Sequence, residues 1–172
     1  ASMSSEANRK YLVNSVRILS GNDSRFITDN SSDNEHATTE ESDAIADIEE
    51  KLGVKMPEFY YRPYGMEFSK YIINPAADIA RIKYLYEEGN IYFYIDKQQT
   101  KKTSNISSLN GNEKVIDTIS VDNIEVLLKE MDDSQDEKMT YIADWNYDDV
   151  VYHIVGKLEL KELKKIIKEM KF

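Results

Sequence analysis

The segment from Tyr141 to Phe172 constrains the fold of this chain more than any other stretch. Within its first part, one set of alternate positions is aromatic or small and apolar: Tyr141, Ala143, Trp145 and Tyr147. Such two-residue alternation is typical of a β-strand. Asp148 and Asp149 follow, and short acidic side chains favour turns because they can bond their own backbone. We therefore expect a strand that turns back at these two aspartates.

The residues after this turn predict a buried strand and a covering helix. Segment 150–155 is apolar on both faces, which favours a central strand covered on both sides. Gly156 interrupts it. Beyond the glycine, apolar residues recur at helical spacing while lysine and glutamate fill the other positions: Leu160, Leu163, Ile166, Ile167 and Met170. An apolar sheet face needs a cover, and we expect this terminal helix to supply it.

Composition restricts the possible functions. The chain has 172 residues and is 41% hydrophobic, which is enough for one domain with its own core. Its net charge of −10 argues against nucleic acid or an anionic lipid surface as partner, because both are bound through clustered lysine and arginine. Cysteine is absent, which excludes disulfides and thiolate chemistry. Ala1-Ser2-Met3 is typical of an expression-vector remnant, so we expect an upstream membrane anchor to have been removed.

Two helices are predicted before the strands. The first runs from about Glu6 to Leu19, and a polar, acidic linker at 29–39 follows it. The second helix is expected to begin with a capping box formed by Thr38 and Glu41 and to end at Gly53. We therefore divide the chain into an N-terminal helix with linker, residues 1–39, and a single domain, residues 40–172.

The middle of the chain predicts strands joined mostly by short loops. The expected strands before the terminal hairpin are 66–73, 79–86, 91–95, 114–120 and 124–128. Short connections favour antiparallel pairing. The predicted fold class is therefore α+β, with an antiparallel meander sheet of six to seven strands, N-terminal helices, and a C-terminal helix packed on the sheet.

Two groups of positions resemble a known bacterial family. An entry segment contains Leu52-Gly53, Pro57, Tyr61, Pro63, Gly65-Met66 and Phe68, and a terminal unit contains Ala143, Trp145, Tyr152, Gly156, Glu162-Leu163 and Ile166-Ile167. In these positions the chain resembles the bacterial domain of unknown function 4367, found in clostridia and related Gram-positive bacteria. The resemblance implies an extracytoplasmic domain behind a membrane helix or lipoprotein anchor, with some relatives in anti-sigma-factor-like membrane proteins. It implies no catalytic residues and no cofactor.

Three groups of polar residues could carry chemistry, and each also has a simpler structural explanation. A catalytic triad would have to use His153, but a histidine on a buried strand is more simply a packed or edge residue. The acidic run 132–137 could bind calcium, yet it lacks the alternating aspartates and the glycine of a calcium loop. Asp144 could pair with Asp148 or Asp149 as acid and base, although an outward polar face and a turn explain them as well.

Tyrosines are the strongest candidates for binding. In segment 91–95, Tyr92 and Tyr94 alternate with apolar residues, so one face is core and the other could be a tyrosine-lined surface. Tyr84 and Tyr86 would lie opposite or beside them across the hairpin. Packing of these rings under a helix is the alternative. The candidate ligand- or partner-binding residues are Tyr84, Tyr86, Tyr92, Tyr94, Tyr60, Tyr61 and Tyr64.

The leading hypothesis is a non-enzymatic, extracytoplasmic binding or sensory domain, tethered to a membrane through the removed upstream anchor. Its partner would be a protein or an envelope ligand, and no metal or cofactor is expected. A carrier of lipid or another hydrophobic ligand, with a curved sheet closed by the terminal helix, is the second hypothesis. A hydrolase that uses the strand and turn carboxylates as acid and base is the third.

Overall fold

The computed structural model describes residues 35–36, 40–97, 113–132 and 138–172. The predicted helix Glu6–Leu19 and most of the predicted linker and acidic run lie outside these ranges. In chain order the elements are β1 (Glu35–His36), α3 (Glu41–Leu52), β2 (Glu58–Phe59), β3 (Glu67–Asn74), the 3₁₀ turn η1 (Pro75–Ala77), β4 (Ile79–Tyr86), β5 (Gly89–Asp96), β6 (Glu113–Val121), β7 (Ile124–Met131), β8 (Thr140–Tyr147), β9 (Val150–Gly156), α4 (Leu160–Lys168) and β10 (Met170–Lys171).

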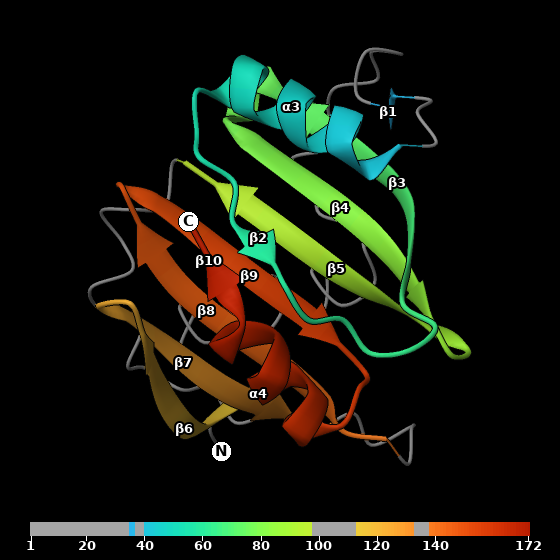
Figure 1. The fold of residues 1–172 in the computed structure, drawn as a ribbon, viewed down its shortest axis with the longest axis vertical. Helices are drawn as coiled ribbons and strands as arrows, with labels where there is room; N and C mark the ends of the chain where they lie inside the picture. The colour runs from blue at the N-terminus through green and yellow to red at the C-terminus, as the bar shows by residue number, and fades with distance from the viewer. Residues whose placement is uncertain (1–34, 37–39, 98–112, 133–137) are drawn as a thin grey trace, which may run out of the picture.

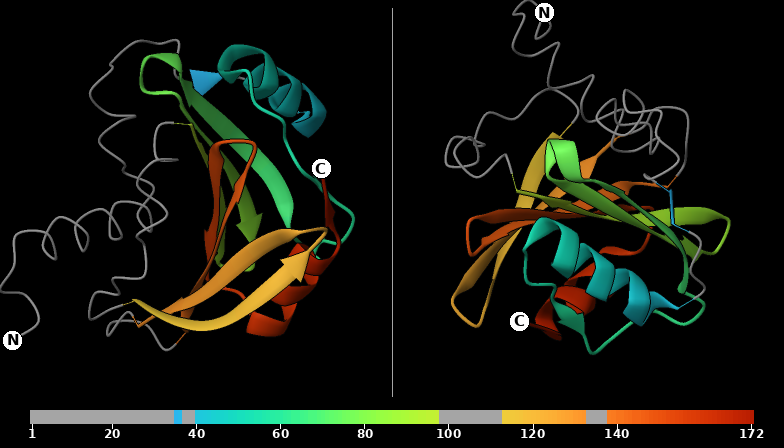
Figure 2. Two further views of the ribbon diagram at one scale, coloured as in Figure 1. Left: turned by 90° about the vertical axis from the view of Figure 1, so that its left-hand side faces the viewer. Right: turned by 90° about the horizontal axis from the view of Figure 1, so that it is seen from above.

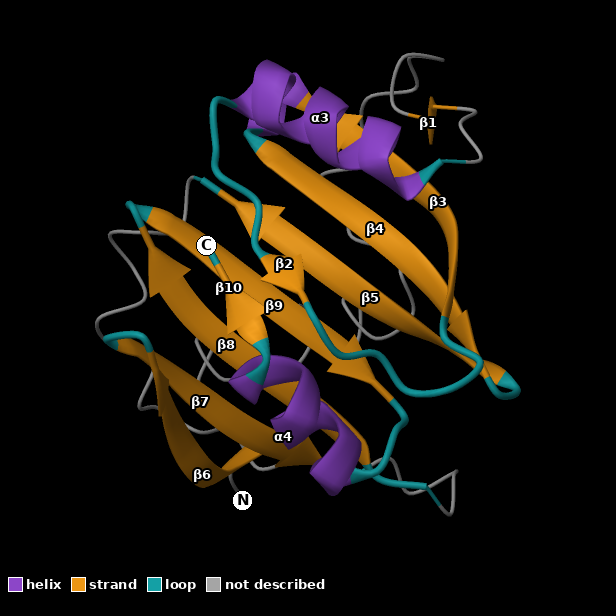
Figure 3. Ribbon diagram, viewed as in Figure 1, coloured by secondary structure: helices purple, strands orange, loops and turns teal. Residues whose placement is uncertain are grey.

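The main sheet consists of two antiparallel meanders that meet at the pair β5–β9 (Figure 3). Its strand order is β1-β3-β4-β5-β9-β8-β7-β6, so the described part of the chain contributes eight strands, of which only β1 is as short as two residues. The predicted α+β fold is confirmed. The single meander expected from the sequence is replaced by two, because β6 lies at the far edge and the chain returns strand by strand to β5.

β9 lies at the centre of the sheet, as its apolar sequence predicted. β5 and β8 flank it, and every residue of β9 except His153 is buried. Asp148 (φ 50°) and Asp149 (φ 61°) join β8 to β9 in two left-handed conformations, the pattern of a type I′ hairpin turn. This turn fixes the register, which places Asp144 opposite His153.

One face of the sheet is covered by α3, α4 and the two-stranded sheet β2–β10 (Figures 1 and 2). We call this the helix face. At its centre the rings of Phe93, Trp145 and Tyr152 stack with centroids 5.6 to 6.1 Å apart, an arrangement that adds to the stabilisation from burying three large apolar surfaces. No helix in the described ranges is long and apolar enough to cross a membrane.

The N-terminal end of α3 differs from the prediction. The helix begins at Glu41 with Glu40 as its N-cap residue and no side-chain cap, so Glu41 cannot occupy the third position of a capping box with Thr38. Instead, the Glu41 carboxylate accepts hydrogen bonds from the guanidinium of Arg62 and from the Tyr84 hydroxyl. The predicted end is confirmed, since Gly53 adopts a left-handed conformation (φ 62°) that closes the last turn.

The C-terminal helix covers the sheet as predicted, but it ends earlier. α4 stops at Lys168, and Leu163 and Ile167 on its apolar stripe are buried. Met170, which the sequence pattern placed on the helix, instead belongs to β10 and pairs with Phe59 of β2. This short pairing ties the end of the chain to the segment between α3 and β3.

The other face of the sheet, which we call the polar face, buries charged groups. Strand alternation places on this face every buried polar side chain of the described residues: Asn74, Arg81, Asp96, Glu113, Lys129 and Thr140. They lie among a smaller apolar cluster that includes Tyr94, Ile142 and Val155. The two faces therefore differ in chemistry, with an apolar core on one side and partly charged packing on the other.

Candidate functional site

A split in the sheet creates the site. The pairing between β7 and β8 ends at Leu127 and Asp144. Beyond this point β7 remains paired with β6 as far as Ile124, and β8 remains paired with β9 as far as Tyr147. The two hairpins thus separate towards their tips (Figure 2). Each has a strand edge that faces the gap.

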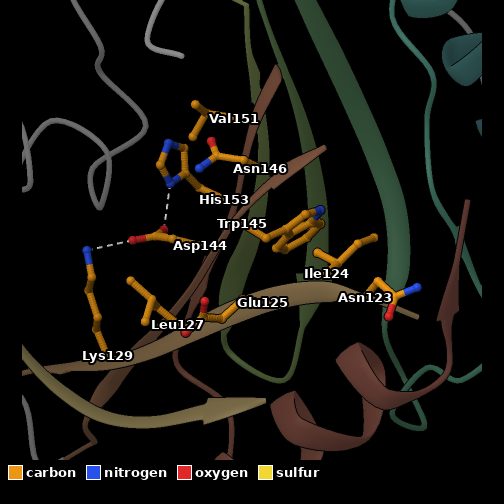
Figure 4. Close-up of a pocket in the computed structure, with 10 residues that line it drawn as sticks. All are labelled: Asn123, Ile124, Glu125, Leu127, Lys129, Asp144, Trp145, Asn146, Val151 and His153. Atoms are coloured by element: carbon orange, nitrogen blue, oxygen red, sulfur yellow. Dashed lines mark hydrogen bonds and ion pairs between the residues drawn. The ribbon is translucent and has the colours of Figure 1, made fainter. Parts of the chain in front are cut away.

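A cleft of about 280 Å³ lies at this divergence. One wall comes from β7 and the turn before it, and the other comes from β8 and β9 (Figure 4). Apolar and polar side chains are mixed along both walls. The lining residues are Asn123, Ile124, Glu125, Leu127, Lys129, Asp144, Trp145, Asn146, Val151 and His153.

Three charged or titratable side chains are linked at one end of the cleft. Lys129 Nζ lies 2.7 Å from Asp144 Oδ2, and His153 Nδ1 lies 2.6 Å from Asp144 Oδ1 (Figure 4). The Lys129 side chain is only 2% exposed, and those of Asp144 and His153 are each 13% exposed. Adjacent strands place the three residues together on the polar face, because Lys129 neighbours Asp144 across β7–β8 and His153 faces it across β8–β9.

The electrostatics of this triad fix the protonation of Asp144. Burial alone would raise the pKa of Asp144, but the neighbouring His153 and Lys129 outweigh it and lower the pKa to about 2. The carboxylate is therefore ionised at neutral pH and can only accept hydrogen bonds. It follows that His153 donates from Nδ1, which leaves Nε2 as an acceptor when the ring is neutral and as a donor when it is protonated.

The lining residues do not complete a nucleophilic triad. An aspartate that orients a histidine is one half of a nucleophilic triad, but the lining residues include no serine, threonine or cysteine to act as nucleophile. Among the described residues no group of three histidine, aspartate, glutamate or cysteine side chains is placed to hold a metal ion. What the cleft offers is a set of hydrogen-bond donors and acceptors beside apolar side chains.

Trp145 connects the cleft to the core. It lines the cleft, yet its ring belongs to the stack on the helix face and is 2% exposed. Its indole N–H finds no acceptor among the described residues. An unpaired buried donor is unfavourable by about 1–3 kcal/mol. Trp145 is also the only tryptophan of the chain.

The structure does not bring the predicted tyrosines onto one surface. Tyr84 points to the helix face, where it is 3% exposed and its hydroxyl donates to Glu41 at 2.6 Å. Tyr92 and Tyr94 point to the polar face and are 8% and 1% exposed. Tyr84 pairs with Ile91 across the hairpin, and strand alternation puts Ile91 and Tyr92 on opposite faces. A shared groove formed by these tyrosines is therefore not present.

The remaining predicted tyrosines lie nearer to solvent. Tyr60 and Tyr64 are 65% and 102% exposed. Tyr61 donates its hydroxyl to Glu162 of α4. Tyr86 lines a second cavity, of about 340 Å³, near the start of α4. None of these residues lines the cleft at the β7–β8 split.

Sequence reasoning considered two members of the triad separately and missed the third. A two-residue turn at Asp148 and Asp149 already places Asp144 opposite His153, so the predicted hairpin contained this pair. Lys129 gave no signal, because a lysine in a strand normally faces water. Asp148 and Asp149 are exposed at the hairpin tip and do not line the cleft, so the structure does not join them to Asp144 as an acid–base pair.

Comparison with known proteins identifies one family. A family model described as a domain of unknown function (DUF4367) matches residues 56–170. This range runs from β2 to the first residue of β10 and includes every residue that lines the cleft. No curated protein and no solved structure matches the chain.

Proposed function

Because this chain belongs to the DUF4367 family, which is described only as a domain of unknown function, we propose from its geometry that it is a non-enzymatic binding or sensory domain. The site is the cleft at the β7–β8 split. The observation that carries the proposal is a partly apolar cleft beside a buried charged triad, at a place where the sheet has stopped pairing with itself. Pockets of this kind, with a few fixed polar groups among apolar ones, are typical of ligand sites.

The geometry favours this cleft over a hydrophobic carrier. The apolar space beneath β2 on the helix face measures only about 10 Å³. It is bounded by side chains such as Phe59, Phe93 and Ile166. A methylene chain needs far more room than this, so a carrier function would require the helix-face cover to open.

The protein would act outside the cytoplasm, held to a membrane through a segment upstream of residue 1. This part of the proposal is supported by the family resemblance. Protease treatment of intact cells that produce the full-length native protein with a C-terminal tag tests it. Loss of the tag without lysis is expected, whereas a tag that is protected until lysis would refute the location.

Binding can be measured through the single tryptophan. Trp145 lines the cleft, so a ligand that enters should change its fluorescence. The full chain is titrated with a panel of envelope components: short peptides, soluble cell-wall fragments, polysaccharide and lipid vesicles. At least one of them is expected to give a saturable change, with binding confirmed by isothermal titration calorimetry.

Two matched variants locate the binding site. Asn146 is exposed and lines the cleft, so Asn146→Phe should fill the cleft and abolish the response. Asn90→Phe makes the same change on the β4–β5 hairpin, away from the lining residues, and should leave the response intact. A panel that gives no saturable binding, or a ligand that binds Asn146→Phe as tightly as the unaltered protein, would overturn the proposal.

A further inference from the structure

We propose that the occupant of this cleft is an extended, positively charged protein segment that adds as a strand to the edge of β7. This inference rests on the proposed binding function and specifies its ligand. It follows from two features of the described residues: an open strand edge and the charge of the wall.

The strand edge provides the template. At Ile124 and Glu125, β7 pairs with β6 on one side, while its pairing with β8 on the other side has ended at Leu127. A strand with an unpaired edge can accept a further strand through main-chain hydrogen bonds. Because the edge lies inside a cleft rather than at the rim of the sheet, a single extended segment fits it better than the flat edge of another domain.

The charge of the cleft selects a basic segment. The positive charge of Lys129 is already balanced by Asp144 at 2.7 Å. Glu125, exposed on β7, then contributes a negative charge that its neighbours in the cleft leave uncompensated. The whole chain adds a net charge of −10, which attracts cationic partners at longer range. A lysine or arginine on the bound segment would complement Glu125.

The remaining cleft groups match a peptide. In a bound strand, side chains alternate between the two sides, so apolar residues can contact Ile124 and Trp145 on the helix-face side while basic residues reach Glu125 on the polar-face side. A peptide supplies both the donors and the acceptors that such a site needs.

The test uses defined peptides on the full chain. The probe is an acetylated and amidated hexapeptide of alternating lysine and valine. One control replaces lysine with glutamate, and a second carries N-methyl groups on alternate residues, which block main-chain pairing. Trp145 fluorescence and calorimetry should show saturable binding of the lysine–valine peptide. The N-methylated peptide should bind at least about tenfold more weakly, as expected when the main-chain hydrogen bonds are lost.

Charge variants complete the test. Glu125→Gln should weaken the lysine–valine peptide roughly two- to fivefold, the effect of one exposed ion pair. Glu88→Gln, in the exposed β4–β5 turn, should not weaken it. Equal binding of the N-methylated or the glutamate peptide would overturn the strand-addition inference. If only a non-peptide member of the panel binds, the strand-addition inference is overturned and the proposed binding function stands. If no member of the panel binds, both the inference and the proposed function are overturned.

Discussion

The substitution Asp144→Asn tests how the triad is held. Asparagine has nearly the same shape, so the change removes one negative charge and little volume. The ion pair between Asp144 and Lys129 is then lost, and a lysine side chain that is 2% exposed is left without its carboxylate partner. Burial without a partner is strongly unfavourable for a charged group.

The expected loss of stability is several kcal/mol. The pKa of Asp144, lowered to about 2, shows that the folded protein favours the ionised carboxylate, which corresponds to about 2 kcal/mol at 1.36 kcal/mol per pKa unit. Removal of one partner from a buried pair generally destabilises by about 3–5 kcal/mol, because the other charge is left uncompensated. We therefore expect Asp144→Asn to lower the free energy of unfolding by about 3–5 kcal/mol.

Urea unfolding at pH 7, followed by circular dichroism, measures this value. The control is the double variant Lys129→Met with Asp144→Asn, in which no charge is stranded, and it should recover most of the stability. A loss below about 1 kcal/mol for Asp144→Asn would show that the ion pair is not buried as described. A double variant no more stable than Asp144→Asn would show that the stranded lysine is not the cause.

Three further predictions follow from single features. The pKa of Asp144 is lowered on folding, so the stability that the ionised carboxylate contributes is fully present above about pH 4 and is lost as pH falls towards about 2. Urea unfolding midpoints should decline over this pH window, and they should decline less in the double variant Lys129→Met with Asp144→Asn. Gly156→Ala should destabilise by about 1–3 kcal/mol, because a Cβ there would lie 2.8 Å from Ile91 Cγ1; an unchanged thermal midpoint would contradict this packing. Tyr64→Ala should change the free energy of unfolding by less than about 0.5 kcal/mol, because the side chain is fully exposed. Any loss of partner binding in this variant would therefore show that Tyr64 contacts the partner.

The elements that the sequence predicted well are those that local patterns encode. The terminal hairpin was predicted because strand alternation and a two-aspartate turn agree, and that turn fixes the register between β8 and β9. α3 was predicted from its apolar stripe and from Gly53, which supplies the left-handed end. In each case the interacting residues are close together in the sequence.

The elements that the sequence did not predict depend on contacts between distant segments. Strand alternation shows which face a side chain occupies, but it does not show which strand lies beside it, so the β5–β9 pairing was hidden. The same limit applies to the cleft, because the end of pairing at Leu127 and Asp144 depends on how the β6–β7 hairpin departs from the sheet. That hairpin is also joined to α4, where Lys164 pairs with Asp117 at 3.0 Å.

Because Lys129 is buried, replacing its ion pair can separate a structural role of the triad from a role in recognition. Replacing a buried ion pair by apolar groups of similar size is often neutral or stabilising, so stability alone gives little reason for charges on the polar face. If the double variant Lys129→Met with Asp144→Asn folds as stably as the unaltered protein but no longer binds the lysine–valine peptide, the charged groups serve the cleft rather than the fold. If it binds with unchanged affinity, the triad is a packing arrangement, and recognition depends on the β7 edge and Glu125 alone.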